Sequence, residues 1–414
     1  MTGLRQYLWS LLVVAFLIAG ALIALRPAGI SGAPAPVRAA SAVSASASLA
    51  SKSAAVSRVA DAGLAAPAAL PAPQAPKLAT QTRAAAGPES PTQPTTSSPA
   101  SVAVTPVNYA VTLSQDTLLP GSTYAVRGFS YSSPGAREVA LLLHGFSYDY
   151  RQWDFPAPSP DPQNPSAYST ARYLASHGID AVAIDLLGVG SSDHPSGLDA
   201  LQLTIPAYAS MAHQIVQSLR SHYEKVVTVG ASAGGEISNV EAGRYRDVDG
   251  TADLGFCDLP LLSAQLVVDN LNPTLVGLVQ PYVDFEGTTA ARDRMFYNLE
   301  DADPAVITQS DGLVQPISSA ELHTAQAQPG RAFDVLVNVP VLVAFGQQDS
   351  AWLPACQTAQ AGLYLSSPSV TTFILPGAGH ALMLQRNAAA LEADPSRIAQ
   401  GALMHLEVWQ LFVA

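Results

Sequence analysis

The chain has 414 residues, a formal net charge of −12 at pH 7 and two cysteines. Because 49 of the 70 residues from 31 to 100 are Ala, Pro, Ser or Thr, the folded part is expected within 101–414. A segment of that length can bury a stable core without a structural metal or a disulfide. That part holds 13 basic and 30 acidic residues, a balance that repels phosphate backbones and disfavours nucleic acid as a partner.

Residues 1–27 predict a segment that enters a membrane. Residues 8–25 carry no charge, and eighteen residues of helix reach about 27 Å, the lower limit for crossing a bilayer. Small residues at 19–21 would suit cleavage by a signal peptidase. The segment is either a cleaved signal peptide or an uncleaved anchor. In both cases we expect an exported protein, secreted or anchored by residues 8–25.

Residues 28–106 predict a disordered linker rich in Ala, Pro and Ser. They contain too few bulky apolar side chains to offset the entropy of ordering the backbone. The catalytic or binding domain is therefore expected at 107–414.

Short apolar runs alternate with helical patterns after residue 107, which is typical of a mostly parallel sheet flanked by helices. Two runs that alternate apolar and polar residues, 109–113 and 124–131, predict an antiparallel hairpin. Continuously apolar runs predict buried strands at 139–143, 181–184, 226–229, 266–268, 341–345 and 370–375. Helices are predicted at 166–176, 206–224 and 397–412.

The strongest single motif is Gly-Ala-Ser-Ala-Gly at 230–234, between a predicted strand and a predicted helix. A serine on such a sharp strand-to-helix turn needs neighbours without large side chains, because the backbone passes close on either side. Ser232 is therefore the candidate nucleophile.

Two more residues follow predicted strands at the positions where a base and an acid would reach this serine. Asp349 follows the strand at 341–345, and His380 follows the strand at 370–375 in a glycine-rich loop. The backbone N–H groups of Phe146 and Ala233 could form an oxyanion hole. Asp269, after the run at 266–268, is an alternative acid.

Five motifs in this order resemble the α/β-hydrolase superfamily over about 138–412. They are His144-Gly145, the segment 185–192, the serine motif, Gly-Gln-Gln-Asp at 346–349 and Gly-Ala-Gly-His at 377–380. The resemblance implies a Ser232–His380–Asp349 triad that works through an acyl-enzyme without a cofactor. It also implies that Asp185, although a Gly-x-Gly follows it, has a structural role and binds no dinucleotide.

The region between the nucleophile helix and the acid strand is expected to hold a cap insertion, at about 250–330. Its aromatic residues could line an acyl pocket or pack the cap onto the core: Tyr282, Phe285, Phe296 and Tyr297. Asp253 and Asp258 are expected in the cap or its loops.

The remaining polar and sulfur-containing residues suggest no metal site. Six histidines lack metal-ligand spacing: His177, His194, His213, His222, His323 and His405. In an exported protein, Cys257 and Cys356 are expected to form a disulfide, with two buried free thiols as the alternative.

These observations predict a serine hydrolase, an esterase- or lipase-like enzyme that acts on small acyl esters or lipid-like substrates. Two alternatives stay open. The domain could be a catalytically silent surface-binding module, or it could keep the triad as an acyltransferase or peptidase, because pocket shape and not the triad selects the acceptor.

Overall fold

A computed structural model of the chain describes residues 102–113, 121–157, 167–259, 280–285, 288–326 and 330–386. All of them lie in the second of two compact units, Thr92–Ala414. The predicted signal or anchor, the strand at 266–268 with Asp269, and the helix at 397–412 lie outside the described residues. None of the helices within those described ranges is long and apolar enough to span a membrane.

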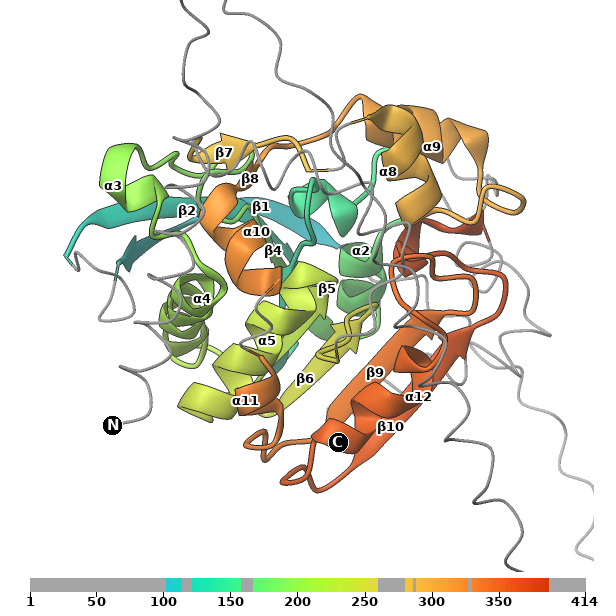
Figure 1. The fold of residues 1–414 in the computed structure, drawn as a ribbon. Helices are drawn as coiled ribbons and strands as arrows, with labels where there is room; N and C mark the ends of the chain where they lie inside the picture. The colour runs from blue at the N-terminus through green and yellow to red at the C-terminus, as the bar shows by residue number, and fades with distance from the viewer. Residues whose placement is uncertain are drawn as a thin grey trace, which may run out of the picture. The chain divides into compact units, whose positions relative to one another are not determined.

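The described residues form an eight-stranded sheet in the order β1-β2-β4-β3-β5-β6-β9-β10 (Figure 1). The strands are β1 (Ala103–Thr112), β2 (Thr123–Ser132), β3 (Glu138–Leu143), β4 (Ile179–Ile184), β5 (Lys225–Ala231), β6 (Gly250–Leu254), β9 (Val341–Gly346) and β10 (Val370–Leu375). Strands β1 and β2 are antiparallel to each other, and β2 is antiparallel to β4. The other neighbours are parallel, which confirms the predicted mostly parallel sheet.

The central strands are apolar because both of their faces are covered. Every residue of β4, β6 and β9 is buried, and β3 and β5 are buried except for their first residues. By contrast, β1 alternates partly buried and exposed residues along most of its length, as an edge strand with one solvated face does.

The helices that cover the sheet are α2 (Thr170–Ser176), α4 (Ile205–Leu219) and α5 (Ala233–Tyr245). Helix α2 connects β3 to β4, toward the β1 edge of the sheet. Helix α4 connects β4 to β5 and α5 connects β5 to β6, both toward the β10 edge. Since parallel crossovers are right-handed, α2 covers one face, and α4 and α5 lie side by side on the other. The strand order reverses around β3, and ligands of open α/β sheets bind at such a reversal, beyond the carboxyl ends of the strands.

Two predicted boundaries are corrected by the sheet. Residues 103–106, assigned to the linker, are the first four of the ten residues of β1. Residues 250–254, assigned to the start of the cap, form β6 between β5 and β9, so Asp253 is a buried residue of the main sheet. The sequence of this strand is not continuously apolar, because it contains Thr251 and Asp253. These polar side chains are buried with hydrogen-bond partners: the Thr228 hydroxyl, for example, donates to the Thr251 hydroxyl at 3.1 Å.

The insertion therefore begins after Leu254 and ends before β9. Its described elements are β7 (Tyr282–Val283), α8 (Thr289–Phe296), α9 (Pro304–Asp311), β8 (Ile317–Ser318), α10 (Ser319–Gln326) and α11 (Arg331–Asp334). Strands β7 and β8 pair with each other in a separate small sheet. Helix α10 packs against α4, and α11 packs against α5.

Candidate active site

Ser232 stands at the turn between β5 and α5. Its backbone lies in the left-handed region, with φ of 52° and ψ of −119°. A Cβ at Gly230 would lie 2.0 Å from the carbonyl oxygen of Gly234, and a Cβ at Gly234 would lie 2.1 Å from that of Leu143. Only glycine fits at both positions, so the motif is what allows the turn. The strained serine is held at the carboxyl end of β5.

The structure brings Ser232, His380 and Asp349 into one hydrogen-bonded chain. Nε2 of His380 lies 2.9 Å from the Ser232 hydroxyl oxygen, and Nδ1 lies 2.8 Å from Oδ2 of Asp349. A carboxylate can only accept, so the imidazole carries its proton on Nδ1, and Nε2 accepts from the serine hydroxyl. This is the arrangement in which an imidazole can take a proton from serine.

The acid and the base are buried, whereas the serine is only half-buried. The side chains of His380 and Asp349 are 2% and 1% exposed. Asp349 follows β9, and its second oxygen accepts a hydrogen bond from the Ala351 N–H at 2.9 Å. The carboxylate is thus fixed from two sides, and only the hydroxyl end of the chain is open to a substrate.

The two predicted oxyanion donors belong to α5 and to the loop after β3. Ala233 is the first residue of α5, so its N–H has no carbonyl partner within the helix. Phe146 follows Gly145, where an added Cβ would lie 3.2 Å from the Ser232 Cβ. The loop after β3 therefore passes directly against Ser232, and Phe146 is the next residue of that loop.

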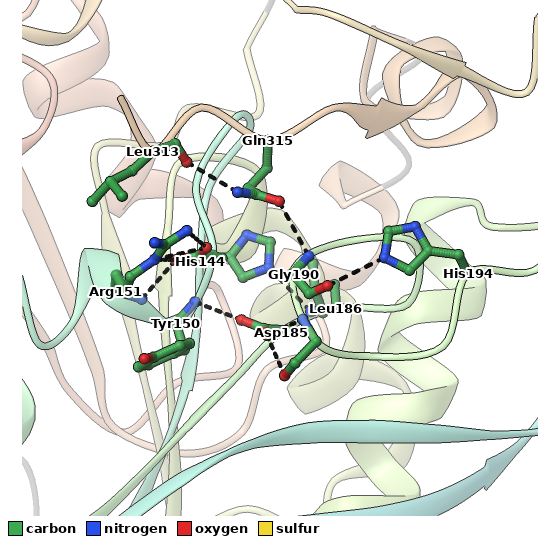
Figure 2. Close-up of polar contacts among 11 residues, drawn as sticks. His144, Tyr150, Arg151, Asp185, Leu186, Gly190, His194, Leu313 and Gln315 are labelled. Carbon is green, nitrogen blue, oxygen red and sulfur yellow. Dashed lines mark hydrogen bonds and ion pairs between the residues drawn. The ribbon is translucent and has the colours of Figure 1, made fainter. Parts of the chain in front are cut away.

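His144 fixes the shape of this loop (Figure 2). Its Nε2 accepts from the Leu186 N–H at 3.1 Å, so the ring proton is on Nδ1 and is donated to the Gly145 carbonyl at 2.9 Å. Burial lowers the pKa of His144, which favours this neutral form. The Gly145 N–H in turn donates to Oε1 of Gln152 at 2.8 Å.

Asp185 and Gln315 join the loops around His144, as Figure 2 shows. Oδ1 of Asp185 accepts from the Tyr150 N–H at 2.9 Å, and Oδ2 accepts from the Ser191 N–H at 2.7 Å. The backbone N–H of Gln315 donates to the Ser147 carbonyl at 3.0 Å, and its side chain accepts from the Gly190 N–H at 3.3 Å. Asp185 thus ties the loops after β3 and β4 together, and the insertion holds both of them.

Helix α8 of the insertion supports the loops that carry the acid and the base. The carbonyl of Phe296 accepts from the Ala381 N–H at 2.9 Å, directly after His380. The Ser350 hydroxyl, directly after Asp349, donates to the carbonyl of Met295 at 3.0 Å. The Phe296 ring also stacks on the His380 ring, with centroids 5.8 Å apart. The two hydrogen bonds are accepted by main-chain carbonyls, which leave no signal in the sequence.

The four aromatic residues of the insertion pack it onto the rest of the domain. Phe285, Phe296 and Tyr297 are buried. Phe285 packs edge-on against Phe146 with ring centroids 4.7 Å apart, and the Tyr297 hydroxyl lies 3.1 Å from that of Tyr148. Tyr282 is half-buried, and its hydroxyl donates to the Pro195 carbonyl at 2.8 Å. These contacts attach the insertion to the loops around the nucleophile.

A disulfide joins Cys257, just after β6, to Cys356, the first residue of α12 (Cys356–Ala359). It closes a loop of 99 residues that contains most of the insertion and Asp349. Near it, Nε1 of Trp352 donates to the carbonyl of Gly255 at 2.9 Å. The segment after β6 and the segment after Asp349 are therefore linked covalently and by a hydrogen bond.

Comparisons with known proteins agree with this fold. A family model described as "Alpha/beta hydrolase family" matches residues 140–393, more than half of the chain. Among solved structures, the chain is similar to a thermophilic esterase from Thermogutta terrifontis, with 19% identity, a TM-score of 0.51, and coverage of 70% of this chain and 98% of that one. At this identity the structural likeness shows the fold alone.

Two other solved structures are similar to smaller degrees. A monoacylglycerol lipase from Paleococcus ferrophilus has 17% identity and a TM-score of 0.45, covering 61% of this chain and 88% of that one. The 2-hydroxy-6-oxo-6-phenylhexa-2,4-dienoate hydrolase from Rhodococcus sp. strain RHA1 has 15% identity and a TM-score of 0.45, covering 72% and 100%. No curated protein matched the chain in sequence.

Proposed function

Because the chain belongs to the alpha/beta hydrolase family, we propose that it is a serine hydrolase that cleaves carboxylic esters through an acyl-enzyme on Ser232. The observation that carries the proposal is the hydrogen-bonded chain Ser232–His380–Asp349, with the serine on a strained turn. Each member has the partner that its role requires.

In the first half of the reaction, His380 Nε2 takes the hydroxyl proton as the Ser232 oxygen attacks the ester carbonyl carbon. The carbonyl oxygen gains negative charge, and the N–H groups of Phe146 and Ala233 donate to it. Asp349 stabilises the imidazolium that forms. When the tetrahedral intermediate collapses, His380 gives the proton to the leaving alkoxide, and an acyl group remains on the serine.

In the second half, His380 removes a proton from water, which attacks the acyl carbon. The new tetrahedral intermediate releases the carboxylic acid, and the proton returns to Ser232. Water could be replaced by an alcohol or an amine at this step, so the same residues would support acyl transfer. We propose water as the acceptor because the half-buried serine is open to solvent.

We also propose that the enzyme works outside the cytoplasm. The uncharged segment at 8–25 and the Cys257–Cys356 disulfide both support export, since such bonds persist in oxidising compartments. Small-to-medium acyl esters and lipid-like esters are the proposed substrates.

A fluorophosphonate probe followed by a chain-length series of p-nitrophenyl esters tests the proposal. We expect covalent labelling on the peptide that contains Ser232, and turnover of at least the shorter esters. Labelling of another serine would contradict the assignment of the nucleophile. Labelling of Ser232 without turnover of any ester would favour a binding module, and faster release with an added alcohol than with water would favour an acyltransferase.

A further inference from the structure

A second group of polar side chains lies between α4 and α5, away from the triad. It consists of His213 on α4, Glu241 on α5 and Asp247, which follows α5. One ligand atom from each residue lies within 4.8 Å of the others. The chain leaves α5 through Arg246 in the left-handed conformation, with φ of 55° and ψ of 38°, and this reversal places Asp247 against α4.

The carboxylate of Glu241 is buried without a hydrogen-bond donor. The residue is 0% exposed, and neither of its oxygens receives a hydrogen bond from an N–H or hydroxyl group of the residues that the structure describes; its side chain pairs with the Asp247 carboxyl. Oδ1 of Asp247 is buried in the same way. A buried carboxylate that receives no hydrogen bond is costly unless a proton or a cation neutralises it. Both oxygens of Glu241 and Oδ1 of Asp247 therefore lack a hydrogen-bond donor, close to the His213 ring.

Side chains on α4 and at its C-terminal end contact Asp247 and its neighbours. Nδ1 of His213 lies 2.8 Å from Oδ2 of Asp247, and the Gln217 side-chain amide donates to the same oxygen. The Arg220 guanidinium donates to the main-chain carbonyl of Asp247 and, at 2.9 Å, to Asp249. The hydrogen bonds of Arg220 thus go to other oxygens than those of Glu241, although the Arg220 charge acts on the Glu241 carboxyl and favours its ionised form.

We propose that His213, Glu241 and Asp247 bind one divalent zinc ion. An imidazole nitrogen with two carboxylates is a donor set that suits Zn²⁺, whereas Ca²⁺ and Mg²⁺ favour oxygen-only ligands in greater number. A flipped Gln217 amide would offer its oxygen as a fourth ligand. The His213 and Asp247 side chains are 28% and 15% exposed, which leaves a path for the ion from solvent.

The ion would hold α4, α5 and the loop before β6 together and would take no part in the chemistry. Glu241 lies nine positions after Ser232 on the same helix, about 13 Å along the axis. The expected effect is therefore on stability. The site also explains why the sequence predicts no metal, because its ligands come from two helices and a loop at spacings of 28 and 6 residues.

The test uses the purified full-length chain, stripped with EDTA and then titrated with ZnSO₄. We expect one zinc per chain by mass spectrometry of the metal, and a Tm several degrees higher with zinc than with EDTA. Glu241→Gln and His213→Gln should each weaken zinc binding at least tenfold and abolish the zinc-dependent rise in Tm. His177→Gln, at an exposed histidine elsewhere, is the matched control and should bind zinc as the unchanged chain does.

Glu241→Gln also tests the alternative occupant, a proton shared by Glu241 and Asp247. The amide imitates a protonated carboxyl, so it should preserve stability if a proton fills the site. Absence of stoichiometric zinc binding by the unchanged chain would overturn the proposal. Equal zinc affinity in the unchanged chain and in His213→Gln, which replaces a partly exposed residue and should fold, would also overturn it.

Discussion

The backbone N–H of Ser232 donates a hydrogen bond to the carbonyl of Leu254 at 2.8 Å. The bond joins the nucleophile to the end of β6, the neighbouring strand in the sheet. Because the Ser232 N–H already donates to Leu254, it is not available to an oxyanion. The proposed oxyanion donors are therefore the N–H groups of Ala233 and of the loop after β3. The position of Ser232 is thus fixed by main-chain contacts, independently of its hydroxyl.

Ser232→Ala should therefore abolish ester turnover and leave the fold unchanged. Alanine keeps the Cβ and the hydrogen bond to Leu254, and only the nucleophile is lost. We expect kcat to fall by roughly 10⁴-fold or more, with loss of fluorophosphonate labelling and a Tm close to that of the parent chain. Residual labelling in this variant would show that a different serine reacts.

The acid can be tested by comparing two aspartates. Asp349→Asn should lower kcat by about 10⁴-fold, because the amide no longer fixes the imidazole with its proton on Nδ1. Asp269→Asn is the matched control, since Asp269 follows a predicted strand but lies outside the described residues. Steady-state kinetics of both variants decide the matter: greater damage from Asp269→Asn would move the acid to that position.

The disulfide should stabilise the domain without taking part in catalysis. Closing a loop of 99 residues contributes about 4–5 kcal/mol in the chain-entropy model. The double variant Cys257→Ser with Cys356→Ser should therefore unfold at a Tm lower by roughly 10 °C. Differential scanning fluorimetry with and without a phosphine reductant measures this. The reductant should lower the Tm of the parent chain and leave that of the double variant unchanged, which controls for other effects of the reagent.

Four buried carboxyl groups interact with one another, the first of them on α5 itself: Glu236, Asp253, Asp258 and Asp334. Burial raises the pKa of Asp258 to about 7, and burial with the neighbouring Asp258 charge raises that of Asp334 to about 10. Burial also raises the pKa values of Glu236 and Asp253 well above their usual range. The folded state therefore binds protons that the unfolded chain releases near pH 4.

This cluster predicts that stability falls as the pH rises. Groups with raised pKa values stabilise the fold fully below about pH 4 and lose that contribution progressively as the pH rises to about 7 for Asp258 and to about 10 for Asp334. We expect Tm to fall by roughly 5 °C or more between pH 6 and pH 9. Asp334→Asn keeps an uncharged group beside Gln360 and should flatten the profile, whereas Glu300→Gln at an exposed site should not. A Tm that rises between pH 6 and pH 9 would contradict the predicted loss of stability with increasing pH.

The arrangement of Ser232, His380 and Asp349 could be predicted from the sequence because it depends on local patterns. Gly230 and Gly234 are required by close approach of the backbone, and Asp349 and His380 each follow an apolar run that forms a strand. Elements that depend on distant partners could not be predicted. Strand β6 contains the buried Asp253, which accepts a hydrogen bond from the Tyr364 hydroxyl at 3.0 Å. Tyr364 is 111 residues away, so no local sequence pattern indicates that it is the partner.

Because α8 accepts hydrogen bonds from the loops after Asp349 and His380, the insertion of this protein cannot be exchanged by itself. An insertion exchanged with one from a relative would remove the carbonyls of Met295 and Phe296 that hold Ser350 and Ala381. Such a chimera would lose catalytic alignment even if its new insertion suited the new substrate. Engineering of specificity in this protein therefore has to transplant the loops at 349–351 and 377–385 together with the insertion.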